Sequence, residues 1–281
     1  MSHIRSYLKR LTSNGYALFH IVQIYLSVGG RFFYWRTRLW FQQIHLVEST
    51  QTRMKQTLLI VRHGQTIWNV EHRLPGQLPG VLLNDNGRQQ AARLAESLTI
   101  LPLSAIISSP LERARDTAEI IAKGRGLEVQ LEPDLMDTDV GPWAGQIIEE
   151  LTKKDPAWKE YVKDPTVAPE GVETFPQVQQ RVVAAVERWR AQDTIGAYPV
   201  FVAHADIVKL LIAHYTGLEA KRAGSLFIDN ASVSLVEINE EHHRSHVVSI
   251  GWSPHPSWLK PPTPEKTESQ EPAHEAGEQK T

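Results

Sequence analysis

The stretch LLIVRHGQTIWN, residues 58–69, places an apolar segment directly before an arginine and a histidine. Residues 58–61 form a short apolar run bounded by polar residues, which is typical of a buried strand in a parallel sheet. Arg62 and His63 then stand at the carboxyl end of that strand. Because open α/β sheets bind their ligands at this edge, the stretch predicts both a strand and a functional site.

Predicted strands and helices alternate downstream of this segment. Strands are predicted at 104–110, 127–133, 199–203, 232–238 and 246–251, and helices at 84–98, 111–123, 146–152, 156–162, 175–190 and 206–217. The first of these helices has Asn84 as its N-cap and small or apolar residues at helical spacing. The alternation indicates an α/β protein: a single three-layer α/β/α domain with a mainly parallel sheet and helices on both faces.

Composition divides the chain into three regions. Residues 1–53 are basic and rich in aromatic residues, residues 54–258 carry the strand and helix patterns, and residues 259–281 form a polar, proline-containing tail that we expect to be disordered. A cationic membrane anchor is one interpretation of the first region. We prefer another, because Met54 opens a natural domain start, MKQTLLIVRHG, so the first region is an appendage or a misassigned start.

The overall composition excludes several classes of function. The 281 residues have a formal net charge of -2, so no basic surface for nucleic acid is expected, and there is no cysteine for a disulfide, a thiolate nucleophile or a cysteine zinc site. No glycine-rich nucleotide loop is present. We expect a cytoplasmic protein; these patterns leave its oligomeric state open.

Two further residues are predicted to join Arg62 and His63. His204 ends the apolar strand VFVAH, and Arg113 lies in the first turn of the helix that follows AIISSP. Guanidinium groups match phosphate oxygens and stay charged, so two arginines and two histidines at one sheet edge favour binding of a phosphate group. Neighbouring positive charge lowers the pKa of a histidine, which keeps His63 neutral and able to act as a nucleophile.

Each of these residues also has a plain structural interpretation. A strand-end histidine is more often a hydrogen-bonded structural residue, and a helical arginine is usually solvated. Trp143 is a candidate for substrate contact, although large aromatic residues more often pack in the core. His242, His243 and His246 cluster near a predicted hairpin turn without carboxylate partners, and we expect no metal site there.

Taken together, VRHGQTIWN, SSPLERARDTA and FVAHAD resemble the motifs of the histidine phosphatase superfamily, which includes the cofactor-dependent phosphoglycerate mutases. The resemblance covers about residues 58–235 and implies a phosphoglycerate mutase-like fold that needs no metal or nucleotide cofactor. It implies that His63 is the phosphorylated nucleophile, with Arg62, Asn69, Arg113 and His204 as phosphate ligands. A small phosphorylated molecule is then the expected substrate.

The superfamily also uses an acid to protonate the leaving oxygen, usually a glutamate in a stretch resembling LxExxxGxWxG. Here the corresponding stretch is LMDTDVGPWAG, residues 135–145, so Asp137 stands at the glutamate's position. Asp137 is therefore the expected general acid. Asp139 is the alternative, although capping of nearby backbone amides is the preferred interpretation of that residue.

Three functions fit these motifs. We favour a phosphatase that hydrolyses small phosphate monoesters through phosphohistidine. A phosphoglycerate mutase-like phosphomutase is the alternative, but the segment 145–175 lacks the longer basic insertion that resembles that of the mutases. A non-catalytic phospholigand-binding or regulatory protein is a third hypothesis, supported only by the aspartate in place of the usual glutamate.

Overall fold

The computed structural model describes residues 27–28, 31–32, 55–239 and 244–256. The chain divides into two compact units, Met1–Gln51 and Thr52–Thr281. In the first unit, β1 (Ser27–Val28) pairs antiparallel with β2 (Arg31–Phe32). The domain limits at residues 53 and 258 stay predictions, and the tail 259–281 lies outside the described residues.

The second unit is built on a sheet of six strands in the order β5-β4-β6-β3-β7-β8. Four strands are parallel to one another, whereas β7 pairs antiparallel with β3 and β8 pairs antiparallel with β7. The bounds are β3 Gln56–Arg62, β4 Ala105–Ser108, β5 Val129–Leu131, β6 Pro199–Ala203, β7 Val233–Asn239 and β8 Arg244–Trp252. The sheet is therefore mainly parallel, as predicted.

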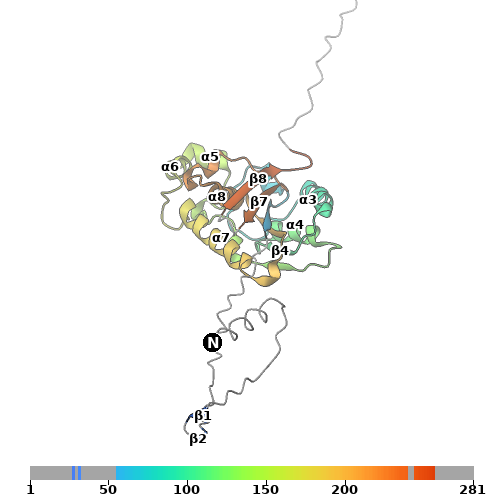
Figure 1. The fold of residues 1–281 in the computed structure, drawn as a ribbon. Coiled ribbons are helices and arrows are strands. Elements are labelled where there is room, and N and C mark those ends of the chain that lie inside the picture. The colour runs from blue at the N-terminus through green and yellow to red at the C-terminus, as the bar shows by residue number, and fades with distance from the viewer. Residues whose placement is uncertain (1–26, 29–30, 33–54, 240–243, 257–281) are drawn as a thin grey trace, which may run out of the picture. The chain divides into compact units, whose positions relative to one another are not determined.

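Helices cover both faces of the sheet (Figure 1). One face carries α3 and α4, and the other carries α7 and α8. The helices are α2 Ile67–Val70, α3 Asp85–Ser97, α4 Glu112–Ala122, α5 Ile148–Lys154, α6 Pro156–Lys163, α7 Phe175–Arg190 and α8 Ala205–Thr216, with 3₁₀ turns η2 Leu98–Ile100, η3 Pro133–Leu135, η4 Gly141–Trp143, η5 Asp193–Ile195 and η6 Ala220–Ser225. The predicted three-layer α/β/α fold is confirmed.

The central part of strand β3, residues 58–61, is apolar throughout because the sheet is covered on both faces. Leu58 and Ile60 pack into the core beneath α7 and α8, while Leu59 and Val61 pack into the core beneath α3 and α4. All four side chains are fully buried. A strand covered on both faces cannot alternate apolar and polar residues, so burial on both sides requires the continuous run.

Local signals account for the helix starts and for the differences from prediction. The Asn84 side chain accepts from the Gly87 backbone amide and begins α3, as predicted, and Thr174 begins α7 in a capping box. The one-turn helix α2 was not predicted, because its four residues are too few for an apolar period and its start rests on the Thr66 cap. Helix α5 begins two residues later than expected.

Candidate active site

The carboxyl ends of β3 and β6 border a cavity of about 530 Å³. His63 follows β3, and its backbone amide donates to Ala203 at the end of β6 at 3.0 Å. The next residue, His204, begins α8. The lining residues are Arg62, His63, Trp68, Asn69, His72, Arg73, Leu74, Pro75, Gly76, Asp137, Thr138, Val140, Ile148, Trp158, Ala205, Asp206, Phe227, Asp229 and Asn230. The two strand-end histidines thus lie at the same edge of the sheet, next to this cavity.

His63 is held in a defined tautomer. Its side chain is buried, and Nδ1 lies 2.7 Å from the backbone oxygen of Gly64. Because a carbonyl oxygen can only accept, Nδ1 carries the proton and Nε2 carries the lone pair. Burial lowers the pKa of His63 well below its usual range, and the charges of Arg113 and Arg62 lower it further. The imidazole is therefore neutral and nucleophilic at neutral pH.

The two arginines offer buried N–H donors that lack partners. Arg113 is fully buried, and its Nη2 donates to the Gly76 oxygen at 2.8 Å and to Asp137 Oδ2 at 3.2 Å. Arg62 Nη1 donates to the Ile228 oxygen at 2.7 Å. Within the described part of the chain, Arg62 Nε and Arg113 Nε and Nη1 have no hydrogen-bond partner. Burial lowers the pKa of both guanidinium groups, yet arginine stays protonated in proteins. These donors can therefore bind an anion.

His204 lies beside His63, with 5.3 Å between the ring centroids. Its Nε2 lies 2.9 Å from Ser109 Oγ, and its Nδ1 lies 3.6 Å from Asp137 Oδ2. Burial lowers its pKa well below the usual range, and Arg113 is the next largest cause. His204 is thus a neutral imidazole whose Nδ1 has no hydrogen-bond partner among the described residues.

Of the two candidate acids, only Asp137 lines the cavity. Its side chain is 15% exposed, and burial raises its pKa to about 6 despite the neighbouring Arg113 guanidinium. Asp139 is exposed, and its Oδ1 accepts from the Gly141 amide at 3.0 Å, as a loop cap does. The loop therefore turns Asp137 toward His204 and Asp139 toward its own backbone.

Asn69 also lines the cavity, and its amide is oriented by hydrogen bonds. The side-chain oxygen Asn69 Oδ1 accepts from the Thr66 backbone amide at 3.0 Å, and the Asn69 backbone amide donates to Thr66 Oγ1 at 3.1 Å. Asn69 Oδ1 is thereby turned toward the protein. The Asn69 NH₂ group is then available to the cavity.

A sequence model of the histidine phosphatase superfamily (branch 1) matches residues 58–251. The chain belongs to this superfamily. It is 35% identical over 196 residues to "Probable phosphoglycerate mutase GpmB" of Shigella boydii, covering 69% of this chain and 88% of that protein.

Solved structures of histidine phosphatases superpose on the chain. YhfR of Bacillus stearothermophilus has a TM-score of 0.65 and 32% identity, covering 70% of this chain and 96% of that one. Mycobacterial glucosyl-3-phosphoglycerate phosphatase has a TM-score of 0.63 and 30% identity, covering 70% of this chain and 100% of the phosphatase chain. The family resemblance read from the motifs is confirmed, and it includes relatives named as mutases and as phosphatases.

Two placements in this histidine phosphatase differ from expectation. Arg113 and His204 are not among the residues that line the cavity, but each contacts the carboxyl group of Asp137, which does line it. Trp143 does not line it either, because it is buried against Trp158 and Tyr161 and its Nε1 donates to an aspartate. Trp158 is the tryptophan of this cluster that reaches the cavity.

Sequence reasoning missed several residues that support the site. Thr117 Oγ1 accepts from the Gly64 amide at 3.0 Å, and Ser109 contacts His204. Both residues lie in the second motif, SSPLERARDTA, together with Arg113. Their short distance from Arg113 in the sequence could therefore have identified them. Asn230 had no such signal, because its partners lie 161 and 167 residues away in the chain.

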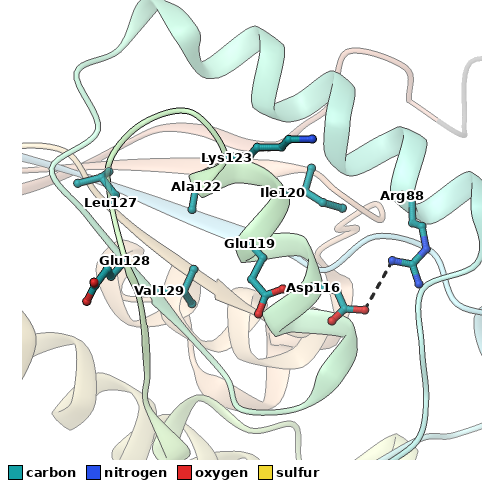
Figure 2. A pocket seen from close by; sticks show the side chains of 9 residues that line it. All are labelled: Arg88, Asp116, Glu119, Ile120, Ala122, Lys123, Leu127, Glu128 and Val129. Atoms are coloured by element: carbon teal, nitrogen blue, oxygen red, sulfur yellow. Dashed lines mark ion pairs between the residues drawn. The ribbon is translucent and has the colours of Figure 1, made fainter.

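A second hollow of about 660 Å³ lies beside α4 (Figure 2). Two cationic side chains, Arg88 and Lys123, line it, and Arg88 Nη1 lies 3.8 Å from Asp116 Oδ2. The lining residues are Arg88, Asp116, Glu119, Ile120, Ala122, Lys123, Leu127, Glu128 and Val129. Acidic and basic side chains are mixed there without a histidine, so this hollow offers none of the chemistry of the first.

Neither a metal centre nor a membrane span is found within residues 55–239 and 244–256 or the first-unit strands. No three histidine, cysteine or acidic side chains in these ranges are grouped as metal ligands. None of the helices there combines the length and the apolar character that crossing a bilayer requires. His242 and His243, part of the histidine cluster noted in the sequence, lie outside the described residues.

Proposed function

We propose that this histidine phosphatase hydrolyses small phosphate monoesters through a phosphohistidine formed on Nε2 of His63. The observation that carries the proposal is a set of buried N–H donors on Arg62 and Arg113 that have no partner among the described residues and lie beside a neutral histidine. Buried donors without partners are costly, and a phosphate dianion would satisfy them. A phosphate bound there would also lie next to the His63 nucleophile.

In the first step, the His63 Nε2 lone pair forms a bond to phosphorus and the phosphorus–oxygen ester bond breaks. The departing alkoxide takes the proton of Asp137, whose pKa of about 6 leaves a substantial protonated fraction in mildly acidic solution. The products of this step are the free alcohol, phosphohistidine and the Asp137 carboxylate.

In the second step, the Asp137 carboxylate accepts a proton from water as the water oxygen attacks phosphorus. The nitrogen–phosphorus bond breaks, inorganic phosphate leaves, and both His63 and Asp137 return to their starting states. Arg62, Arg113 and the Asn69 amide stabilise the charge on the transferring phosphoryl oxygens. His204 assists this charge stabilisation in the tautomer that carries the proton on Nδ1, because Nδ1 can then donate to a phosphoryl oxygen.

The cavity walls favour hydrolysis over transfer between positions of an acidic sugar or glycerate. Beyond the phosphate site, the cationic side chain Arg73 is already bonded to Glu71 at 3.1 Å and to the Gly145 oxygen at 2.7 Å. Trp68, beneath the Arg73 guanidinium, and the exposed Phe227 add apolar surface. A second anionic group on the substrate would find few free cations, which disfavours phosphoglycerate.

The phosphomutase nevertheless remains the alternative function, because the relative in Shigella boydii is named as a mutase. A mutase would return the phosphoryl group from His63 to a rebound product. The non-catalytic binding protein is the third candidate, and it would retain the phosphate ligands without turnover. We propose a cytoplasmic role for the phosphatase, since the chain has no cysteine that would require an oxidising compartment.

The decisive experiment uses the full chain with and without His63→Ala. Phosphate release is measured from p-nitrophenyl phosphate and from sugar and glycerate phosphates. We expect release by the wild type and none by the variant, with an acid-labile phosphoryl label trapped only on the wild type. Phosphate conserved on an isomerised glycerate with a phosphorylated primer would establish the mutase instead. Phosphate binding without either reaction would establish the binding protein.

A further inference from the structure

Asn69 can bind a phosphate only if its NH₂ group faces the cavity. Its Oδ1 accepts two hydrogen bonds, from the Thr66 amide at 3.0 Å and from Asn230 Nδ2 at 3.2 Å. Turning the amide over would set its NH₂ against both of these donors. The two bonds therefore fix one orientation of the Asn69 amide, with its donor end toward the cavity.

Asn230 contacts the nucleophile segment as well as Asn69. Its Nδ2 also donates to the backbone oxygen of His63 at 3.2 Å, and that oxygen accepts from the Ala231 amide at 3.0 Å. Asn230 itself is buried. One side-chain amide thus links the backbone of the proposed nucleophile to the side chain of a proposed phosphate ligand.

The loop that presents Asn230 is tightly held. The Asn230 amide donates to Asp229 Oδ1 at 2.8 Å, and Ser232 Oγ donates to the Asp229 oxygen at 2.7 Å. Ala231 has a φ of 47°, in the left-handed region that residues with a Cβ seldom adopt. A strained backbone persists only where its surroundings fix it, and such positions gather at functional sites.

We infer that Asn230 is a positioning residue that holds the Asn69 NH₂ toward the phosphate and fixes it relative to His63. The inference rests on the proposed function and extends it to a residue that acts on the phosphate through Asn69. Without Asn230 Nδ2, only the Thr66 backbone amide restrains Asn69 Oδ1. The side-chain amide of Asn69 can then rotate and turn its oxygen toward the phosphate. The loss is then a loss of phosphate affinity and of transition-state stabilisation together.

The test is a double-mutant cycle of Asn230→Ala and Asn69→Ala in the full chain. Both kcat/KM for phosphate release and the dissociation constant of inorganic phosphate, measured by calorimetry, are determined for all four proteins. A hydrogen bond to a charged group accounts for about ten- to 150-fold, so each single variant should lose about that factor in kcat/KM. The cycle should be strongly non-additive, because Asn230→Ala has little left to remove once Asn69 is alanine.

Ser232→Ala is the matched control, because it deletes a buried hydrogen bond of the same loop without touching Asn69. We expect Ser232→Ala to lower the thermal midpoint, while the effect of Asn69→Ala on kcat/KM and on phosphate binding stays unchanged. Asn230→Ser also deletes the amide and replaces Asn230→Ala in the cycle if the alanine variant does not fold.

Additive effects of Asn230 and Asn69, on binding or on turnover, would overturn the inference. So would a Ser232→Ala variant that reproduces the loss seen in Asn230→Ala. Failure of the proposed function is distinguishable: a wild type that binds phosphate but releases none would refute hydrolysis, while the calorimetric cycle would still decide the role of Asn230.

Discussion

Replacing Asp137 by asparagine should separate its role as an acid from its role in the fold. The substitution keeps the size of the side chain and its acceptor for Arg113 Nη2, which lies 3.2 Å away, but removes the transferable proton. General acid catalysis contributes about 10²- to 10⁴-fold. We expect Asp137→Asn to lose that factor in kcat/KM for an alkyl phosphate, whose alkoxide cannot leave without a proton. For p-nitrophenyl phosphate, whose phenolate leaves unaided, the first step should slow by less than about tenfold.

The same substitution should stabilise the fold. A rise of the Asp137 pKa from its ordinary 3.8 to about 6 means that the folded state binds more protons than the unfolded state between these values. Stability therefore falls as pH rises through that window, and above about pH 6 the ionised carboxylate costs at most about 3 kcal/mol. The uncharged asparagine avoids this penalty. Its thermal midpoint should exceed that of the wild type at pH 8 and approach it in acid.

Phosphate release from the two substrates and thermal unfolding across pH are measured for the wild type, Asp137→Asn and Asp139→Asn. The Asp139 variant is a matched control, because it changes an exposed cap in the same loop. Equal losses of kcat/KM, which reports the first step, on alkyl and aryl substrates in Asp137→Asn would refute its role as the acid that protonates the leaving group. A leaving-group effect that appears in Asp139→Asn instead would reassign that role.

Three further outcomes follow from the geometry. His63→Ala should lower kcat at least about a thousandfold while the fold persists, checked by phosphate release and circular dichroism; retained turnover would exclude His63 as nucleophile. kcat/KM of the wild type should fall as pH rises through about 6, because Asp137 must be protonated and the lowered pKa of His63 keeps it neutral in acid; a flat profile would contradict this. Phe227→Ala should raise KM for p-nitrophenyl phosphate about two- to tenfold and leave KM for glycerol phosphate unchanged; equal shifts would mean that Phe227 does not contact the leaving group.

Buried parallel strands are the part of the fold that sequence predicts best. Residues 58–61 and β6 are apolar throughout because each is covered on both faces, and a histidine follows each run within two residues. Since the carboxyl ends of parallel strands meet at one edge, strand assignment alone brought His63 and His204 together. The 5.3 Å between their rings is a direct consequence of strand pairing.

Contacts that depend on loop geometry were beyond reach of the same reasoning. Asp137 was identified by resemblance, but nothing in its sequence indicates that its carboxyl contacts both Arg113 and His204. The choice between Asp137 and Asp139 turns on the backbone around Gly141, whose φ of 50° lets the Asp139 side chain cap the loop. Such a turn is fixed by tertiary packing as much as by local residues.

The direction of β7 explains how a distant loop reaches the site. β7 runs antiparallel to β3, with Val233 opposite Val61, so the start of β7 lies beside the end of β3. The Arg62 amide accordingly donates to the Ser232 oxygen at 3.1 Å, and Asn230 comes within reach of the His63 backbone. A parallel strand in that place would bring its last residues to this edge and carry the preceding loop to the opposite one. The antiparallel pairing thus gives the site a support that parallel strands alone would not provide.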